Sequence, residues 1–231
     1  MKNNKSAGCD LLRAEHLKYA PDLLYEEIAE LLNNVVETGE FPKELKIGLL
    51  VPLQKPRKKK GPPENLRPVI LLSTLRKVLA ICTITRINAK VREDIIPNTQ
   101  AAYSAGRSTT ELVFAFKLLA EKAITSSDYE LSILMLDMSK AFDTIQRGTL
   151  FEDLKEILTI DELNLIHLLL NDVQLAVKLE DKIGKLFESR IGSPQGDAAS
   201  ALFFIIYLAV SLKIAEKKTQ KHRKQGPPSH L

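Results

Sequence analysis

The chain has 231 residues, a formal net charge of +4 and a hydrophobic content of 45%. This length allows one large domain or two modest ones, and the mild positive charge only weakly favours an anionic partner. Cys9 and Cys82 show neither CxxC nor Cys/His spacing, which excludes a disulfide framework and a zinc site and indicates reduced thiols. The first ten residues hold no apolar signal core, and the apolar run 198–210 is shorter than the roughly 18–20 residues that span a bilayer. We therefore expect an intracellular protein of the nucleus or cytoplasm, without a membrane partner.

The first third of the chain predicts a helix and a pair of strands. Pro21 opens an amphipathic helix that ends near Gly39. Residues 45–53 and 69–72 are β-type runs. The segment between them, residues 54–65, is basic and rich in proline, so the pattern predicts two strands joined by a mobile, positively charged loop.

The middle of the chain predicts a single strand among helices. Residues 131–137 form an apolar run that predicts a buried central strand ending in Asp137. The predicted helices cover residues 73–96, with Ser73 or Thr74 as the cap and Pro97 as the stop, and residues 108–124, 147–158 and 161–171.

The last third predicts two strands and a long helix. Residues 174–179 and 185–191 are strand candidates around a turn at 181–184. A Gly/Pro loop, residues 192–196, precedes an apolar helix over 198–215, and the last dozen residues are predicted to fray. Because helices and strands mix without strict alternation, the fold class is α+β.

Asp137 follows the predicted strand directly, and Phe142 and Asp143 come five and six positions later. Strand residues are rarely acidic, so a carboxylate at the end of a strand suggests a metal ligand on a rigid element. Mg²⁺ prefers such hard oxygen ligands and usually takes one or two protein carboxylates. The alternative is an Asp that caps the next helix.

Three further segments suggest an anionic ligand, and each has a plainer alternative. The basic stretch 51–73 could close over a nucleoside triphosphate or a nucleic-acid backbone, or be a solvated charge run or nuclear-import signal. The basic loop that starts segment 100–114 could present amides to phosphate, or be a plain helix start. Gln195, kept close by Gly196, could offer its amide to a ligand, or lie in an ordinary helix N-terminal turn.

In order and spacing, these four segments resemble the reverse transcriptases of non-LTR retrotransposons, from about Gly8 to about Leu212. LDMSKAFDTI, residues 136–145, resembles motif A of that family. The resemblance implies that Asp137 holds the two catalytic Mg²⁺ ions, with Mn²⁺ as a substitute, and that Met138 lends a backbone carbonyl. It also implies that Phe142 is the steric gate that rejects a ribose 2′-OH.

Two other segments resemble the parts of that family that contact the nucleotide. GSPQGDAASALFF, residues 192–204, resembles motif B, which implies that Gln195 and Gly196 line the nucleotide site. NLRPVILLS, residues 65–73, resembles the fingers segment, which implies that Arg67 grips the triphosphate, with Lys55 as the fingers lysine upstream.

QAAYSAGRST, residues 100–109, resembles the segment in which Gly106 and Arg107 line the template path. The implied fold is an incomplete right-hand polymerase of fingers plus a partial palm with a ferredoxin-like sheet, without a thumb. Its expected divisions are an N-terminal arm (1–20), fingers and leading palm helices (21–125), a partial palm with motifs A and B (126–215) and a basic, disordered tail (216–231).

The chain departs from the family pattern in several places. Leu66 stands where the family has Tyr, and Asp197 stands where it has a small residue; Asp197 could perturb the metal or nucleotide environment, or cap the helix. Motif C, the Asp-Asp hairpin, is absent, because the 231 residues contain no Asp-Asp pair. The later lysine-bearing palm segment and the thumb are absent too. Since two-metal chemistry needs carboxylates on both sides of the ions, we expect this chain alone to be inactive.

The resulting expectation is a reverse transcriptase fragment of a retroelement, whose parent enzyme adds dNTPs to a DNA primer on an RNA template. The alternative is a degenerate, nucleic-acid-binding remnant without an enzymatic role. An RNA-dependent RNA polymerase is disfavoured, because such enzymes usually place a polar group where Phe142 stands. A small-molecule metalloenzyme lacks a supporting His/Glu constellation. The sequence names no protein partner.

Overall fold

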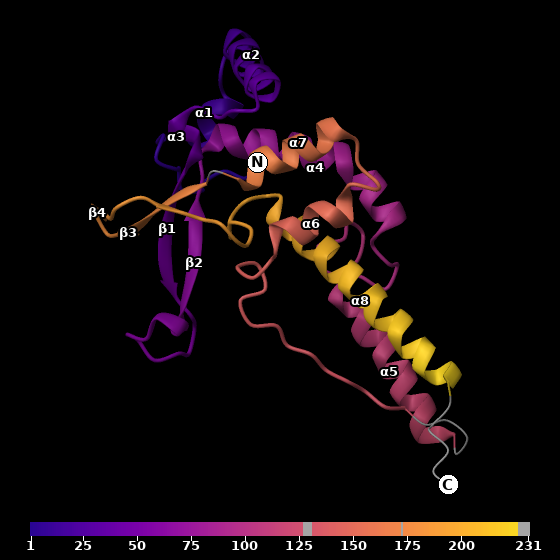
Figure 1. The fold of residues 1–231 in the computed structure, drawn as a ribbon. Coiled ribbons are helices and arrows are strands. Elements are labelled where there is room, and N and C mark those ends of the chain that lie inside the picture. Colours follow the sequence, from indigo (N-terminus) through magenta and orange to yellow (C-terminus); the bar gives the residue numbers. More distant parts are fainter. Residues whose placement is uncertain (127–130, 172, 226–231) are drawn as a thin grey trace.

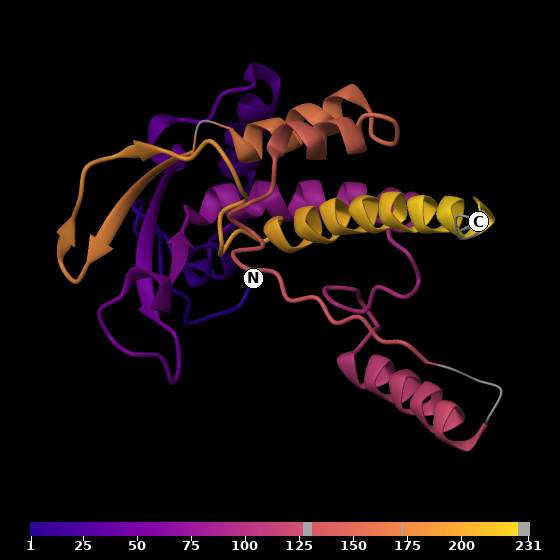
Figure 2. The same ribbon diagram turned by 60° about the horizontal axis from the view of Figure 1, so that its bottom comes forward.

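The computed structural model describes residues 1–126, 131–171 and 173–225, with side chains as far as residue 218. It contains a small mixed sheet beside a group of helices (Figures 1 and 2). The helices are α1 (Ala14–Lys18), α2 (Asp22–Thr38), α3 (Lys43–Lys46), η1 (Pro63–Asn65), α4 (Thr74–Asp94), α5 (Thr109–Thr125), α6 (Arg147–Leu154), α7 (Ile160–Leu170) and α8 (Ser200–Gln225). The strands are β1 (Ile47–Gln54), β2 (Leu66–Leu71), β3 (Gln174–Leu179), β4 (Lys182–Ile183) and β5 (Phe187–Glu188).

The sheet has the strand order β2-β1-β3-β4, and β5 also pairs with β3. β1 runs antiparallel to β2, with Leu50 opposite Ile70, because the basic loop returns the chain directly. β1 runs parallel to β3, with Ile47 opposite Gln174, so the chain returns to the sheet only after four intervening helices. β1 is therefore paired with β2 over Leu49–Gln54 and with β3 over Ile47–Leu50.

The main hydrophobic core lies among the helices rather than under the sheet. Side chains from α4, α6, α7 and α8 form one buried cluster, in which Ile87, Leu150, Ile166 and Ile206 have no exposed surface. A smaller cluster where the sheet meets the helices contains Ile70, Leu72, Val173 and Leu175. In contrast, α5 contributes no buried residue, and Figure 2 shows it standing apart from α8.

Several predicted boundaries are confirmed, each for a local reason. α2 starts directly after Pro21 and ends at Gly39, whose φ of +70° suits glycine. α5 starts after Ser108, whose side chain accepts the N–H of Glu111. The first two predicted strands and strand 174–179 are β1, β2 and β3. The predicted α+β class is confirmed by this mixture of helices and strands.

The predicted central strand over residues 131–137 is wrong, because the structure gives this segment no regular secondary structure. Leu134 and Met135 are 83% and 88% exposed. A strand needs a neighbour for its backbone hydrogen bonds, and β1 already pairs with β2 and, over Ile47–Leu50, with β3. The apolar, β-type sequence is present, but no described strand pairs with it. The expected ferredoxin-like sheet therefore lacks its central strand.

Three smaller expectations also need correction. The strand predicted over 185–191 is reduced to β5, and the turn predicted at 181–184 contains β4. The tail predicted to be disordered from residue 216 continues as α8 as far as Gln225, and residues 226–231 lie outside the described residues. Ser73 precedes α4 but makes no capping bond, because its hydroxyl donates to Asp10 Oδ2 at 2.6 Å.

The bond between Ser73 and Asp10 is one of several contacts that hold the N-terminal arm against the junction of β2 and α4. Thr74 Oγ1 donates to the carbonyl of Leu12 at 2.6 Å. Gly8 lies so close to the segment between β2 and α4 that a Cβ would stand 2.8 Å from the backbone of Leu72. The arm is thus held against the end of the strand that carries Arg67.

Candidate nucleotide site

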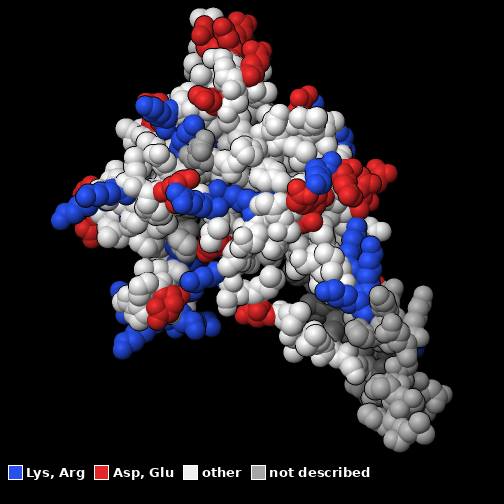
Figure 3. Space-filling view, in the orientation of Figure 1, with Lys and Arg blue, Asp and Glu red and all other residues white. Residues whose placement is uncertain are grey.

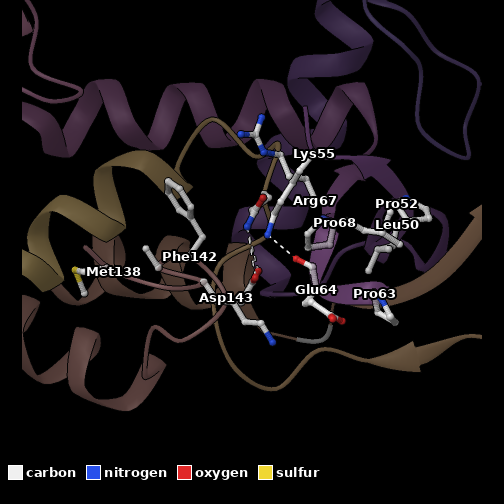
Figure 4. Close-up of a pocket in the computed structure, with 14 residues that line it drawn as sticks. Leu50, Pro52, Lys55, Pro63, Glu64, Arg67, Pro68, Met138, Phe142 and Asp143 are labelled. Atoms are coloured by element: carbon white, nitrogen blue, oxygen red, sulfur yellow. Dashed lines mark hydrogen bonds between the residues drawn. The ribbon is translucent and has the colours of Figure 1, made fainter. Parts of the chain in front are cut away.

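A pocket of about 770 Å³ opens between the β1–β2 hairpin and the turn at residues 138–143 (Figure 4). Three cations, Lys55, Arg67 and Lys140, share it with the carboxylates of Glu64 and Asp143. The remaining lining residues are Leu50, Pro52, Pro63, Leu66, Pro68, Met138, Ala141, Phe142 and Gln195. Of the predicted site residues, the structure thus brings Lys55, Arg67, Met138, Phe142 and Gln195 together.

The hairpin supplies the cationic side of the pocket. Lys55 follows β1 and Arg67 lies in β2, so the sheet register sets the spacing of both cations. Lys55 Nζ donates to the carbonyl of Glu64 at 2.7 Å, which turns the lysine across the hairpin (Figure 4). Figure 3 shows Lys and Arg side chains gathered over the loop between β1 and β2, at the lower left of the view. The predicted basic loop therefore borders the pocket.

The opposite side is built by two loops joined through their backbones. The N–H of Ser193 donates to the carbonyl of Phe142 at 2.9 Å, and the N–H of Gly192 donates to the carbonyl of Ile145 at 2.9 Å. Gly192 has a φ of +73°, and a Cβ there would lie 2.7 Å from the carbonyl oxygen of Asp143. Only glycine allows this close approach, so the loop before α8 and the turn at 138–143 form one wall.

Phe142 is held by two aromatic rings from distant segments. Its ring centroid lies 6.4 Å from that of Tyr103, in an edge-to-face arrangement, and 5.2 Å from that of Phe204. Tyr103 precedes α5 and Phe204 lies in α8. Three of the four segments singled out in the sequence therefore meet at this ring.

A buried arginine anchors the wall from behind. Arg147, the first residue of α6, donates Nε to the carbonyl of Gly192 at 2.9 Å and Nη1 to the carbonyl of Ser189 at 2.8 Å. Its Nη2 also reaches Ser189 Oγ at 3.1 Å and the carbonyl of Ile191 at 3.3 Å. One side chain thus binds the carbonyls of Ser189, Ile191 and Gly192 in the loop that leads to Gln195.

Asp197 lies three residues before α8 and makes no side-chain hydrogen bond to the N–H of a residue within that helix among the bonds of the described residues. It is buried, it is not among the residues that line the nucleotide pocket, and its Oδ1 accepts the N–H of Ala199 at 3.1 Å just before α8. Its Oδ2 lies 3.9 Å from Nε of the fully buried Arg76. Burial raises the pKa of Asp197, and the Arg76 charge opposes that rise. We interpret Asp197 as a structural residue at the start of α8.

Four predicted site residues lie outside the pocket lining. Asp137 is exposed at the end of the irregular segment 131–137. Gly196 has a φ of +116° and packs against the backbone of β2, where a Cβ would stand 2.5 Å from the carbonyl oxygen of Ile70. Gly106 is in an exposed turn with a φ of +72°, and Arg107 pairs with Glu111 at 2.9 Å on the first turn of α5.

Sequence reasoning did not assign two residues that shape the pocket. Asp143 faces into the pocket beside Gln195 (Figure 4), and its position directly after Phe142 was the available signal. Arg147 had no signal, because an arginine at a helix start resembles any exposed cation in the sequence.

The described residues contain no group of three or more His, Cys, Asp or Glu side chains placed to hold a metal ion. Asp137 belongs to no such group in this part of the chain, so the donors present do not fit a two-metal site. Among the helices that the structure describes, none is long and apolar enough to cross a membrane.

Comparison with known proteins gives one consistent result. The profile of the family "Reverse transcriptase (RNA-dependent DNA polymerase)" matches residues 56–225. Similar curated proteins are the probable RNA-directed DNA polymerases from transposon BS and from transposon X-element of Drosophila melanogaster, with 27% and 28% identity over 89% of this chain. The Transposon TX1 uncharacterized 149 kDa protein of Xenopus laevis is 32% identical over 67% of the chain.

The chain spans 23% of the length of each of the two Drosophila polymerases. A truncated apo telomerase of Candida tropicalis superimposes on 80% of the chain with a TM-score of 0.44 and 15% identity. The family profile covers most of the chain, and the similar proteins come from transposons. The assignment of the chain to a family therefore rests on the sequence matches. The chain belongs to the reverse transcriptase (RNA-dependent DNA polymerase) family, and it is a partial reverse transcriptase domain of retroelement type.

Proposed function

We propose that the pocket between the β1–β2 hairpin and the 138–143 turn binds the incoming dNTP of template-directed DNA synthesis. The observation that carries this proposal is the meeting of Lys55, Arg67, Phe142 and Gln195 in one pocket, although they come from three separate segments. The family's activity is RNA-dependent DNA synthesis. In the longer polypeptides that the chain resembles, the pocket would serve dNTP addition to a DNA primer on an RNA template.

Different residues of the pocket would contact different parts of the dNTP. Lys55 and Arg67 lie where they can neutralise a triphosphate, and the guanidinium of Arg67 can make paired hydrogen bonds to phosphate oxygens. Phe142 is the proposed sugar gate, because Tyr103 and Phe204 hold its ring in place and a fixed ring leaves no room for a 2′-OH. Gln195 contributes an amide on the same side as Phe142.

The metal chemistry of the family would need more than these residues. Reverse transcriptases use divalent metal ions, and we propose Mg²⁺, with Mn²⁺ as a substitute, bound through Asp137 and the backbone of Met138 in a complete enzyme. In the described part of this chain Asp137 belongs to no group of three or more potential metal ligands, and the 231 residues contain no Asp-Asp pair. Since a lone carboxylate cannot bring two dications together, we propose that the 231-residue chain has negligible polymerase activity by itself.

Nucleic acid would approach along the basic surfaces. Arg107 and Gly106 are proposed to line the template path, and the exposed loop that contains Arg57 adds positive charge beside the pocket (Figure 3). A second candidate function, a nucleic-acid-binding remnant without enzymatic activity, is favoured by the same loop together with the missing carboxylates.

The test is binding of a fluorescent dNTP to the isolated chain, followed by anisotropy. Replacing Arg67 with Gln should weaken binding at least about fivefold, because a charge-assisted contact to phosphate is lost. Replacing Arg57, which lies outside the pocket lining, with Gln is the matched control and should leave affinity within about twofold. Equal losses in the two variants would contradict the pocket as the binding site.

Two further measurements separate the candidates. Replacing Phe142 with Ala should reduce the preference for a dNTP over the matching ribonucleotide, and an unchanged preference would refute the gate. Primer extension with Mg²⁺ or Mn²⁺ should show no product, and clear templated synthesis would contradict the proposed inactivity. Salt-sensitive binding of an RNA–DNA duplex without any dNTP binding would support the remnant instead.

A further inference from the structure

Asp143 and Gln195 form a side-chain pair inside the pocket. Nε2 of Gln195 lies 3.4 Å from Oδ1 and 3.5 Å from Oδ2 of Asp143, so one N–H is shared by both carboxylate oxygens (Figure 4). Both residues line the pocket and both are partly buried. Asp143 directly follows Phe142, the proposed sugar gate.

The backbones on both sides of the pair are already held. The carbonyls of Phe142 and Ile145, on either side of Asp143, accept N–H groups from the loop before Gln195. The carbonyl of Gln195 accepts the N–H of Ile70 at 2.7 Å, which binds this loop to β2 as well. Only the side-chain torsions of Gln195 therefore remain to be set, and Asp143 is the group that contacts its amide.

The hydrogen-bonding chemistry of the two groups fixes the orientation of the Gln195 side-chain amide. An ionised carboxylate only accepts hydrogen bonds, whereas a Gln amide carries N–H donors at one end and a carbonyl acceptor at the other. The donor end must therefore face Asp143, and Oε1 is turned toward the rest of the pocket. We infer that Asp143 is a positioning residue, which makes Gln195 present a hydrogen-bond acceptor to a hydroxyl or amino group of the ligand.

Protonation of Asp143 would weaken this selection, because a protonated carboxyl can also donate. Burial raises the pKa of Asp143, while the hydrogen bond from Gln195 and the charge of Lys140 act against that rise. Lys55, Arg67 and Glu64 line the same pocket from the hairpin side. The preferred orientation should thus be present above this raised pKa and fade below it.

The first experiment tests the pair without any ligand. The side-chain amide signals of Gln195 in ¹⁵N NMR spectra are assigned by their loss in Gln195→Ala and followed while the pH is lowered. In the wild type they should shift as Asp143 is protonated, and in Asp143→Asn this shift should disappear. Asp181→Asn, in the exposed turn between β3 and β4, is the matched control and should titrate like the wild type.

An amide signal that does not move, or that moves equally in Asp143→Asn, would overturn the inference. Far-UV circular dichroism and thermal melting show whether each variant is folded. If Asp143→Asn unfolds, Asp143→Glu keeps the carboxylate and should retain a pH-dependent shift. Loss of that shift in a folded Asp143→Glu chain would also overturn the inference.

The second experiment measures the consequence for binding, and this part rests on the proposed function. Asp143→Asn should weaken dNTP binding roughly threefold to tenfold when Gln195 is present, and should not weaken it in a Gln195→Ala background. Equal effects in both backgrounds would show that Asp143 acts on the ligand directly, contrary to the inference. If the wild type binds no dNTP, the proposed function fails, and the NMR titration alone decides the inference.

Discussion

The N–H of Ile70 donates to the carbonyl of Gln195 at 2.7 Å, which joins the fingers-like strand β2 to the loop before α8. Arg67 lies three residues before Ile70 on the same strand, and Gly196 follows Gln195 directly. The cationic side of the pocket and its amide side are thus connected through one backbone contact. A change that opens this contact should therefore damage both sides of the pocket.

Gly196 offers the cleanest way to test this contact. Gly196→Ala should destabilise the chain by about 3 kcal/mol, because a Cβ would clash with the backbone of β2 and the backbone conformation suits only glycine. Gly148→Ala is the matched control, since a Cβ there meets nothing within 4 Å. That helical substitution should be neutral or stabilising by up to about 1 kcal/mol. Urea unfolding measures both, and equal effects would contradict the close packing at Gly196.

Arg147 should matter more for folding than its position at a helix start suggests. Arg147→Met removes the hydrogen bonds to the loop at residues 189–192 and leaves the buried carbonyl of Gly192 and the partly buried carbonyl of Ser189 unsatisfied, with an expected loss of about 3 kcal/mol. Arg190→Met, at a side chain that is 81% exposed, should change the unfolding free energy by less than about 0.5 kcal/mol. If the two variants unfold at the same urea concentration, Arg147 is not the anchor described above.

The lowered pKa of Glu162 predicts that the free energy of unfolding depends on pH. Burial alone raises its pKa, but the ammonium of Lys90, 2.9 Å away, and the N–H of Thr159 more than offset this, so its pKa is lowered. The ionised carboxylate therefore stabilises the folded chain above the ordinary pKa of Glu, and this contribution is lost as the pH falls through the lowered value. Glu162→Gln should cost about 1–2 kcal/mol at pH 7.

The cost of Glu162→Gln should shrink toward zero once the pH is below the lowered pKa of Glu162, which unfolding curves of both chains at pH 7 and pH 2 can measure. Glu156→Gln is the control, because Glu156 is outside the Lys90 contact and its substitution should have the same small effect at both pH values. A cost of Glu162→Gln that grows in acid would contradict the assigned direction.

Leu134 and Met135 test the correction to the predicted central strand. Because both side chains are almost fully exposed, changing both to Ser should alter the unfolding free energy by less than about 0.5 kcal/mol. Leu150→Ala removes a side chain with no exposed surface, and should cost about 2–5 kcal/mol. A large loss in the Leu134/Met135 variant would mean that the segment is packed as a strand.

Elements governed by local signals could be predicted from the sequence. Pro21 and Gly39 bound α2, and Ser108 starts α5, because each acts on the chain within one helical turn. The segment 131–137 failed for the opposite reason. Its strand propensity depends on a partner strand, and propensity alone does not supply one.

The candidate site shows the same difference between features set by local sequence and features set by tertiary contacts. Motif order identified Arg67, Phe142 and Gln195, and they do line one pocket. The sequence did not reveal which side chains hold them there, because Tyr103, Phe204 and Arg147 act through tertiary contacts. Asp137 was predicted beside the same pocket, but it depends on the segment that did not form a strand, and it is exposed.

The parallel pairing of β1 with β3 has a consequence for the synthesis of the chain and for experiments that truncate it. Ile47 finds its partner Gln174 only after the four helices α4 to α7 have been synthesised, so one edge of β1 stays open until then. Long-range parallel pairings of this kind form slowly and expose strand edges to neighbouring chains. Fragments that end before β3 would keep that edge open permanently, so single substitutions in the intact chain will dissect this protein better than deletions.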